Sequence, residues 1–274
     1  MPRTTADAEH NGFKKIGGCD TTAHWRGQRY IKNDDYAVVL LYDIHGFIAG
    51  IQTTVPKDQG RNYPKPPIEP PFVSDGNRWV ISAYFVDPST ICTKGRTVQE
   101  FNAEGTGTNL YIQNSTSPEH SVLIPHKEAD IRGTKWVEGN CFLTMGKHYW
   151  YNLKADMSCD TVFPVFLLYN HGELTAFGWA LITNLTSTRY EHPTPSSFGL
   201  HNSVHHSYST TNISATAQLQ LHPPYRGETD IWICLPKIFF IKIFMKTVPT
   251  CLNTAGVLST MHIYLTGNYA LDTC

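Results

Sequence analysis

The chain has 274 residues and a formal net charge of −1, and only 16% of its residues are charged. This length suits one large β domain or two smaller ones, and it is enough to bury a substantial core. Because the charge is close to zero, we expect no nucleic acid partner. Tyr, Phe, Trp, Gly and Pro are plentiful, and long helical Ala/Glu/Lys/Leu segments are absent, which favours strands joined by turns.

Two apolar stretches, residues 36–55 and 165–182, predict β-hairpins at the centre of the fold. In each, Leu-Leu-Tyr followed by Asp or Asn leads into a His-Gly turn and a second apolar strand. We therefore predict a mainly β protein, an antiparallel sandwich or barrel. Two alternatives explain the similarity of the hairpins: two related halves that each contribute a central hairpin, or a chance match of residues common in strands and turns.

Other segments complete the predicted domain. Residues 1–18 are polar and predict a disordered lead-in, and the Pro-rich residues 56–77 predict a stiff surface loop. Residues 19–199 together with 247–274 form the predicted β-rich domain. Further strands are expected at residues 79–86, 110–112, 122–124, 135–137 and 257–265.

Residues 200–246 differ in composition from the rest of the chain, and we expect them to be an insertion or a non-domain segment. They begin rich in His, Ser, Thr and Asn and end in an apolar run with lysines at 231–246. That run is too short for a transmembrane helix, which needs about 20 apolar residues. A membrane-interfacial helix and a buried strand pair are the alternatives, so membrane contact depends on whether residues 231–246 belong to the protein.

The seven cysteines are dispersed and contain no Cys-x-x-Cys pair, which favours disulfides over a zinc or redox motif. Omitting the suspected insertion removes Cys234 and leaves an even number, six. Asn-x-Ser/Thr sequons at Asn114, Asn184 and Asn212 agree with secretion and glycosylation. The first residues lack the apolar segment of a signal peptide. Either a signal sequence is missing here or the protein is cytosolic with reduced thiols, and the cysteines favour an extracellular protein.

Aromatic residues provide the first functional hypothesis. Flat indole and phenol faces stack on sugar rings or hold small molecules, and the predicted ligand-binding residues are Trp25, Tyr149, Trp150 and Trp179. Alternation along a strand places Tyr149 and Trp150 on opposite faces, so part of this set is equally explained as core. The expected function is an extracellular module that binds a glycan or small molecule, or a structural module. The sequence does not define the oligomeric state.

The alternative hypothesis is an extracellular metalloenzyme. Thirteen histidines invite a transition-metal site for Cu, Zn or Fe, although no His-x-His or His-Glu-x-x-His motif is present. Histidines on separate strands form the candidate ligand set: His24, His148, His171 and His262. The catalytic candidates are His148 and His171, with Glu173 or Asp160 as a carboxylate partner. A hydrogen-bonded structural role is the simpler explanation for each histidine.

Overall fold

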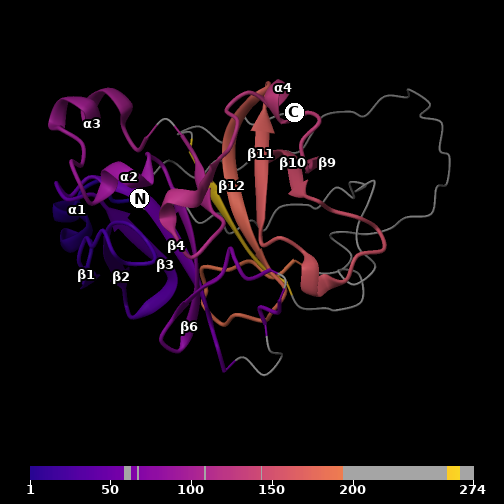
Figure 1. The fold of residues 1–274 in the computed structure, drawn as a ribbon, viewed down its shortest axis with the longest axis horizontal. Helices are drawn as coiled ribbons and strands as arrows, with labels where there is room; N and C mark the ends of the chain where they lie inside the picture. Colours follow the sequence, from indigo (N-terminus) through magenta and orange to yellow (C-terminus); the bar gives the residue numbers. More distant parts are fainter. Residues whose placement is uncertain (59–62, 67, 108, 143, 194–257, 266–274) are drawn as a thin grey trace, which may run out of the picture.

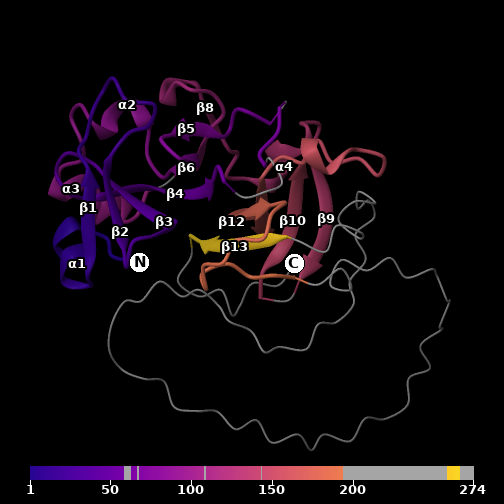
Figure 2. The same ribbon diagram turned by 90° about the horizontal axis from the view of Figure 1, so that it is seen from below.

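In the structure, a computed structural model, residues 1–58, 63–66, 68–107, 109–142, 144–193 and 258–265 are described. These residues form a mainly β protein with two antiparallel sheets that share one hydrophobic core (Figure 1). A view from below shows the two sheets next to each other (Figure 2). The predicted fold class is confirmed, and the arrangement is consistent with a sandwich.

The large sheet contains the N-terminal half of the chain. Its strands lie in the order β1-β2-β3-β4-β6-β7-β8, and β5 pairs with β6. The bounds are β1 (Phe13–Gly17), β2 (Gln28–Lys32), β3 (Asp35–Tyr42), β4 (Ile48–Pro56), β5 (Val73–Asp75), β6 (Arg78–Tyr84), β7 (Tyr111–Gln113) and β8 (Ser121–Leu123).

The small sheet has the order β13-β12-β11-β10-β9. Its strands are β9 (Trp136–Phe142), β10 (Gly146–Tyr151), β11 (Val165–Asn170), β12 (Glu173–Leu181) and β13 (Ser259–Tyr264). The helix α1 (Thr5–His10) precedes β1. Other short helical segments lie between strands: α2 (Pro88–Ile91), α3 (Val98–Glu104), η1 (Pro118–His120), α4 (Glu128–Ile131) and η2 (Cys159–Thr161).

Both predicted hairpins exist and lie within their sheets. The first is β3–β4 and the second is β11–β12. Their turns differ, because His171 and Gly172 have φ angles of 49° and 82° in a tight two-residue turn, whereas the first hairpin is closed by a longer segment that contains Gly46. His45 also contacts the Arg96 carbonyl through Nδ1 at 2.8 Å, whereas the side chain of His171 is exposed at its turn.

Successive side chains along the strands of the large sheet point alternately to its two faces. Leu40 and Tyr42 belong to the core shared with the small sheet, whereas Val39 and Leu41 belong to a second apolar cluster with Ile91 of α2. We call the side of the sheet that carries Val39 and Leu41 the outer face. In the small sheet, Phe177 of β12 faces the large sheet, since its ring contacts that of Phe85 at 6.5 Å between centroids.

Two expectations for loops are corrected. Residues 1–18 contain α1 and β1 instead of a disordered lead-in, and Thr4 forms a β-bridge with Phe47 while Ala8 is fully buried. The Pro-rich loop is not only a surface spacer, because Tyr63 and Phe72 within it are buried in the core and their ring centroids lie 5.5 Å apart. In each segment, burial of a few apolar side chains against the rest of the protein stabilises an ordered structure, even though the average composition of the segment is polar.

The suspected insertion at 200–246, the apolar run at 231–246 and Asn212 lie outside the described residues. Within the part of the chain that the structure describes, no helix is long and apolar enough to span a membrane.

Candidate functional site

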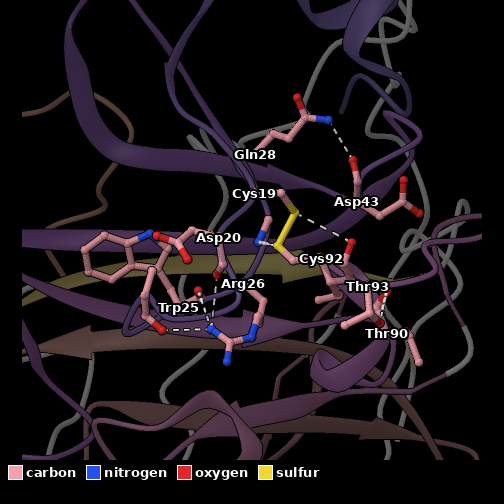
Figure 3. The surroundings of a disulfide bond; sticks show 12 residues. Cys19, Asp20, Trp25, Arg26, Gln28, Asp43, Thr90, Cys92 and Thr93 are labelled. Carbon is pink, nitrogen blue, oxygen red and sulfur yellow. Dashed lines mark hydrogen bonds between the residues drawn. A yellow bond between two sulfur atoms is a disulfide. The ribbon is translucent and has the colours of Figure 1, made fainter.

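The segment between β1 and β2, residues 18–27, is fixed by a disulfide. Cys19 is bonded to Cys92, which directly follows α2 (Figure 3). The amide of Gly27 donates to the Cys92 sulfur at 3.1 Å. Both cysteines pack against the outer-face cluster of the large sheet. The bond therefore ties an irregular segment to this face of the sheet. Cys141 and Cys159 are disulfide-bonded as well.

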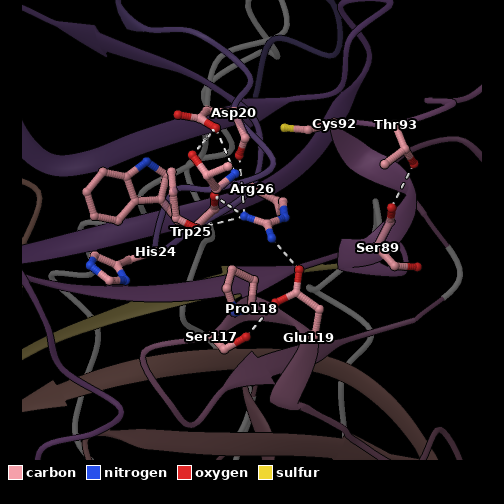
Figure 4. Close-up of polar contacts among 12 residues, drawn as sticks. Asp20, His24, Trp25, Arg26, Ser89, Cys92, Thr93, Ser117, Pro118 and Glu119 are labelled. Carbon is pink, nitrogen blue, oxygen red and sulfur yellow. Dashed lines mark hydrogen bonds and ion pairs between the residues drawn. The ribbon is translucent and has the colours of Figure 1, made fainter.

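A buried arginine gives the same segment its shape. The Arg26 guanidinium donates to the carbonyls of Ala23 at 2.7 Å and Trp25 at 3.1 Å, and it forms an ion pair with Glu119 of η1 (Figure 4). The Ser117 hydroxyl donates to Glu119 at 2.5 Å, and this hydrogen bond together with Arg26 holds the pKa of Glu119 below its ordinary value. Because the guanidinium satisfies carbonyls that no strand partner satisfies, the segment keeps one conformation.

The central feature of the site is the stacking of Trp25 on Arg29 of β2. The Arg29 guanidinium carbon lies 4.4 Å from the centroid of the half-buried indole. Arg29 lies opposite Leu41 in the β2–β3 register and so shares the outer face. Its Nε donates to Gln52 Oε1 at 3.0 Å and its Nη1 to Asp75 Oδ2 at 2.8 Å. We call Trp25, Arg29 and Asp75 the Trp25 platform.

His24 lies next to this platform and is exposed. The side chains of His24 and Trp25 project to the same side, away from Arg26 and Glu119 (Figure 4). His24 Nδ1 lies 3.1 Å from the carbonyl of Thr116, and Gln113 Nε2 donates to the His24 carbonyl at 2.6 Å. His24 is therefore attached to the turn that carries the Asn114 sequon.

The platform combines a flat apolar face with polar groups at its edge, held by charged and hydrogen-bonded contacts. An aromatic ring backed by a guanidinium gains cation–π stabilisation, and little side-chain entropy is lost when a ligand covers a ring that is already held in place. The arrangement is therefore suited to binding a ligand at the indole face.

Of the four aromatic residues predicted to bind a ligand, only Trp25 offers a partly exposed face. Trp179 is fully buried in the core, and Tyr149 and Trp150 are 3% and 4% exposed. As alternation predicted, Tyr149 and Trp150 lie on opposite faces of β10, because Tyr149 makes an edge-to-face contact with Tyr169 while Trp150 stacks on His148. The structure corrects the predicted set for these three residues, which are packing residues because aromatic side chains dominate the burial in β cores.

The four candidate metal ligands are not assembled into one site. His148 and His262 are neighbours, with ring centroids 6.0 Å apart, but His24 contacts Thr116 beside the large sheet and His171 lies in the β11–β12 turn. Among the described residues, no group of three or more His, Cys, Asp or Glu side chains is arranged to hold a metal ion. Burial, and next the neighbouring His262, lowers the pKa of His148 to about 3, so His148 is neutral near pH 7.

The catalytic candidates are not assembled into one site, although His171 and Glu173 lie together at the β11–β12 turn. Asp160 pairs with Lys65 at 3.0 Å. Glu173 pairs with Lys127 and accepts from His126 Nδ1 at 2.6 Å, and these contacts, Lys127 foremost, hold the pKa of Glu173 below its ordinary value. His148 contacts neither carboxylate in these pairs.

The sequence analysis did not name Arg29 and Asp75 of the candidate site. Arg29 lies on β2 and Asp75 on β5, and the two residues that form this ion pair are distant in the chain. Only the proximity of an arginine to Trp25 along the sequence could have pointed to the platform. Comparison with models of known protein families, with curated proteins and with solved structures finds no match.

Proposed function

We propose that the protein is an extracellular, disulfide-containing glycoprotein that binds carbohydrate on the Trp25 platform. One observation carries the proposal: the half-buried indole of Trp25 is stacked on a guanidinium that Gln52 and Asp75 hold in place. Pyranose rings have an apolar C–H face and polar hydroxyl edges, and they match an aromatic face with hydrogen-bonding groups at its edge.

The polar groups around the indole suit hydroxyl recognition. The Asp75 side chain is 31% exposed, so a carboxylate oxygen that accepts from Arg29 also lies within reach of solvent. His24 is exposed and lies beside the indole. A carboxylate accepts hydrogen bonds from sugar hydroxyls, and an imidazole donates or accepts them, so one ring hydroxyl pattern would be preferred over others.

An extracellular location is supported by the disulfide and by the sequons. Disulfides persist in oxidising compartments and are rare in the cytosol. The side chains of Asn114 and Asn184 are both exposed on connecting segments, where a glycan would be accommodated without disturbing a strand. Intact mass of protein secreted from a eukaryotic host, measured before and after deglycosylation, tests glycosylation, and Asn114→Gln and Asn184→Gln should each remove one glycan.

Binding is tested with secreted, enzymatically deglycosylated protein on a panel of immobilised glycans, followed by titration calorimetry with the best binder. We expect Trp25→Ala to weaken binding at least about tenfold, which corresponds to about 1.4 kcal/mol. Trp79→Ala is the matched control, because Trp79 is also half-buried with a cation over its ring, Lys57 Nζ at 4.8 Å from the centroid. Absence of binding to any glycan, or equal losses in the two variants, would contradict the proposal.

A further inference from the structure

A cavity of about 190 Å³ lies away from the Trp25 platform, where the two sheets meet near the β11–β12 turn. Four parts of the chain form its walls: the residue after β6, residues 106–107 and 109–110 of the next loop, the segment at 124–126 and the start of β12, with Leu265 after β13 completing the lining. The volume is below the range of about 300–1,000 Å³ typical of drug-sized ligands, which implies a smaller molecule.

Backbone hydrogen bonds between distant segments fix the walls. The amide of Ile124 donates to the Leu110 carbonyl at 2.8 Å, and the amide of Leu174 donates to the His126 carbonyl at 2.8 Å. The first bond extends the large sheet and the second joins the same segment to the small sheet. The cavity is therefore built by the backbone connection between the two sheets.

Gly107 allows the loop to close over the end of β6. Its φ of 143° is one that residues with side chains rarely adopt, and a Cβ atom there would lie 2.2 Å from the carbonyl oxygen of Phe85. The amide of Asn109 donates to the same oxygen at 3.4 Å. Only glycine permits this close approach of two backbones, so the loop is held as a wall and does not lie in the cavity.

The lining has an apolar body and a polar mouth. Its apolar members are Phe85, Leu110, Ile124, Leu174 and Leu265. Apolar surface of this kind favours hydrocarbon over water, and an apolar cavity of about 150 Å³ in another protein binds benzene.

The charges at the mouth are balanced. Glu173 accepts from His126 at 2.6 Å and forms an ion pair with Lys127, and His126 and Lys127 are more than 60% exposed. The positive charge of Lys127 cancels that of Glu173, so a charged ligand would find no uncompensated opposite charge here. The imidazole and carboxylate of this group still have capacity for one further hydrogen bond each.

We propose that this cavity binds a small neutral molecule with an apolar body and a single hydrogen-bonding head group, such as a hydroxyl. The five apolar side chains would cover the body, and His126 and Glu173 would bind the head group. A neutral head is preferred because an ionic one would lose hydration without gaining a partner of opposite charge.

The test compares three probes with the same six-carbon chain: 1-hexanol, hexanoate and hexylammonium. Each is titrated into the full chain at pH 8, and backbone amide shifts are followed by NMR. We expect saturable shifts at residues 106–107, 109–110 and 173–175, with 1-hexanol binding at least about threefold more tightly than either charged probe. Thr106→Phe should abolish these shifts, since Thr106 lines the cavity and a larger side chain would fill it.

Thr188→Phe is the matched control, because Thr188 is exposed and does not line the cavity. It should leave binding of 1-hexanol unchanged. The proposal is overturned if none of the probes gives saturable shifts, if a charged probe binds most tightly, or if Thr106→Phe binds like the control. Because the Trp25 platform is not involved, failure here leaves carbohydrate binding unaffected.

Discussion

The guanidinium carbon of Arg29 lies 4.4 Å from the centroid of the Trp25 indole, and this contact connects a strand to the irregular segment that precedes it. The same guanidinium reaches Asp75 on β5, a strand that pairs with β6 and is not a neighbour of β2 in the large sheet. One buried side chain therefore sets both the position of the indole and the position of the carboxylate next to it, so that binding and stability depend on the same residue.

Asp75→Asn tests this dependence. The Arg29 side chain is 8% exposed, so its charge would lose its carboxylate partner in a poorly hydrated place. We expect the free energy of unfolding to fall by about 1–3 kcal/mol, between the values for surface pairs and for buried pairs. Urea titration measures it. In the exposed Lys65–Asp160 pair, Asp160→Asn should cost less than about 1 kcal/mol. Equal effects of the two substitutions would show that Arg29 does not need Asp75.

The disulfide between Cys19 and Cys92 should stabilise the fold because it closes a long loop of the chain. The two residues are 73 positions apart, and a loop of that size corresponds to about 4 kcal/mol of lost unfolded-state freedom. A Cys19→Ser/Cys92→Ser double variant should lose about that much in urea titration and should also lose carbohydrate binding. Chemical reduction is a poorer test, because Cys141 and Cys159 are also disulfide-bonded. A loss below about 1 kcal/mol would mean that the segment is ordered by Arg26 alone.

Local sequence patterns predicted the two hairpins correctly, because a hairpin pairs two strands that are adjacent in the chain. Alternation in β3–β4 and β11–β12 and the His-Gly turns lie within a single stretch of sequence, and pairing follows from chain proximity. The disordered lead-in was wrong for the opposite reason. β1 is stabilised by pairing with β2, and Thr4 by a bridge to Phe47, neither of which polar composition reveals.

Of the residues that form the candidate site, the sequence analysis predicted only the aromatic one, Trp25. Trp25 was selected for its aromatic side chain. The ion pair beside it joins Arg29 to Asp75, which lies 46 positions later, and no local pattern links these two residues. The same holds at the cavity, where Glu173 was named while His126, 47 positions earlier, was missed. Such pairs are contacts between residues far apart in the chain, and they follow from the sheet topology, which local sequence patterns do not reveal.

Gly178 tests how tightly the side of the small sheet that carries His148 is packed. A Cβ atom at Gly178 would lie 2.2 Å from Phe166 Cζ and 2.4 Å from the Met261 carbonyl oxygen. The Phe166 ring is itself fixed between His148 and His262. Gly178→Ala should therefore lower the free energy of unfolding by about 1–3 kcal/mol, measured in urea.

Gly18→Ala is the control for that measurement, because a Cβ atom at Gly18 would meet no atom within 4 Å. Its effect should stay within about 0.5 kcal/mol, the usual range for a surface substitution. If Gly178→Ala were equally neutral, Phe166 would have to move away from β12, and the ring stack on His148 would not persist in solution.

Burial of His148 predicts a loss of stability in acid. Burial lowers its pKa from 6.5 to about 3 in the folded protein. Between these values the unfolded chain binds a proton that the folded chain does not, so stability is fully present above about pH 6.5 and decreases as the pH falls. The steepest decrease from this residue is about 1.4 kcal/mol per pH unit. His148→Phe keeps an aromatic ring among Phe142, Trp150 and Phe166 but cannot titrate.

The measurement is urea unfolding at pH 7, 6, 5 and 4 for the wild type and for His148→Phe. The carboxylates contribute equally to both proteins, so the difference in slope isolates the histidine, and we expect a shallower loss in the variant. His171→Asn is the control, since His171 is exposed in a turn with φ of 49°, a conformation that asparagine tolerates. It should follow the wild type at every pH. If His148→Phe also followed the wild type, the imidazole would be hydrated in solution, and the side of the small sheet that carries it would be open to water.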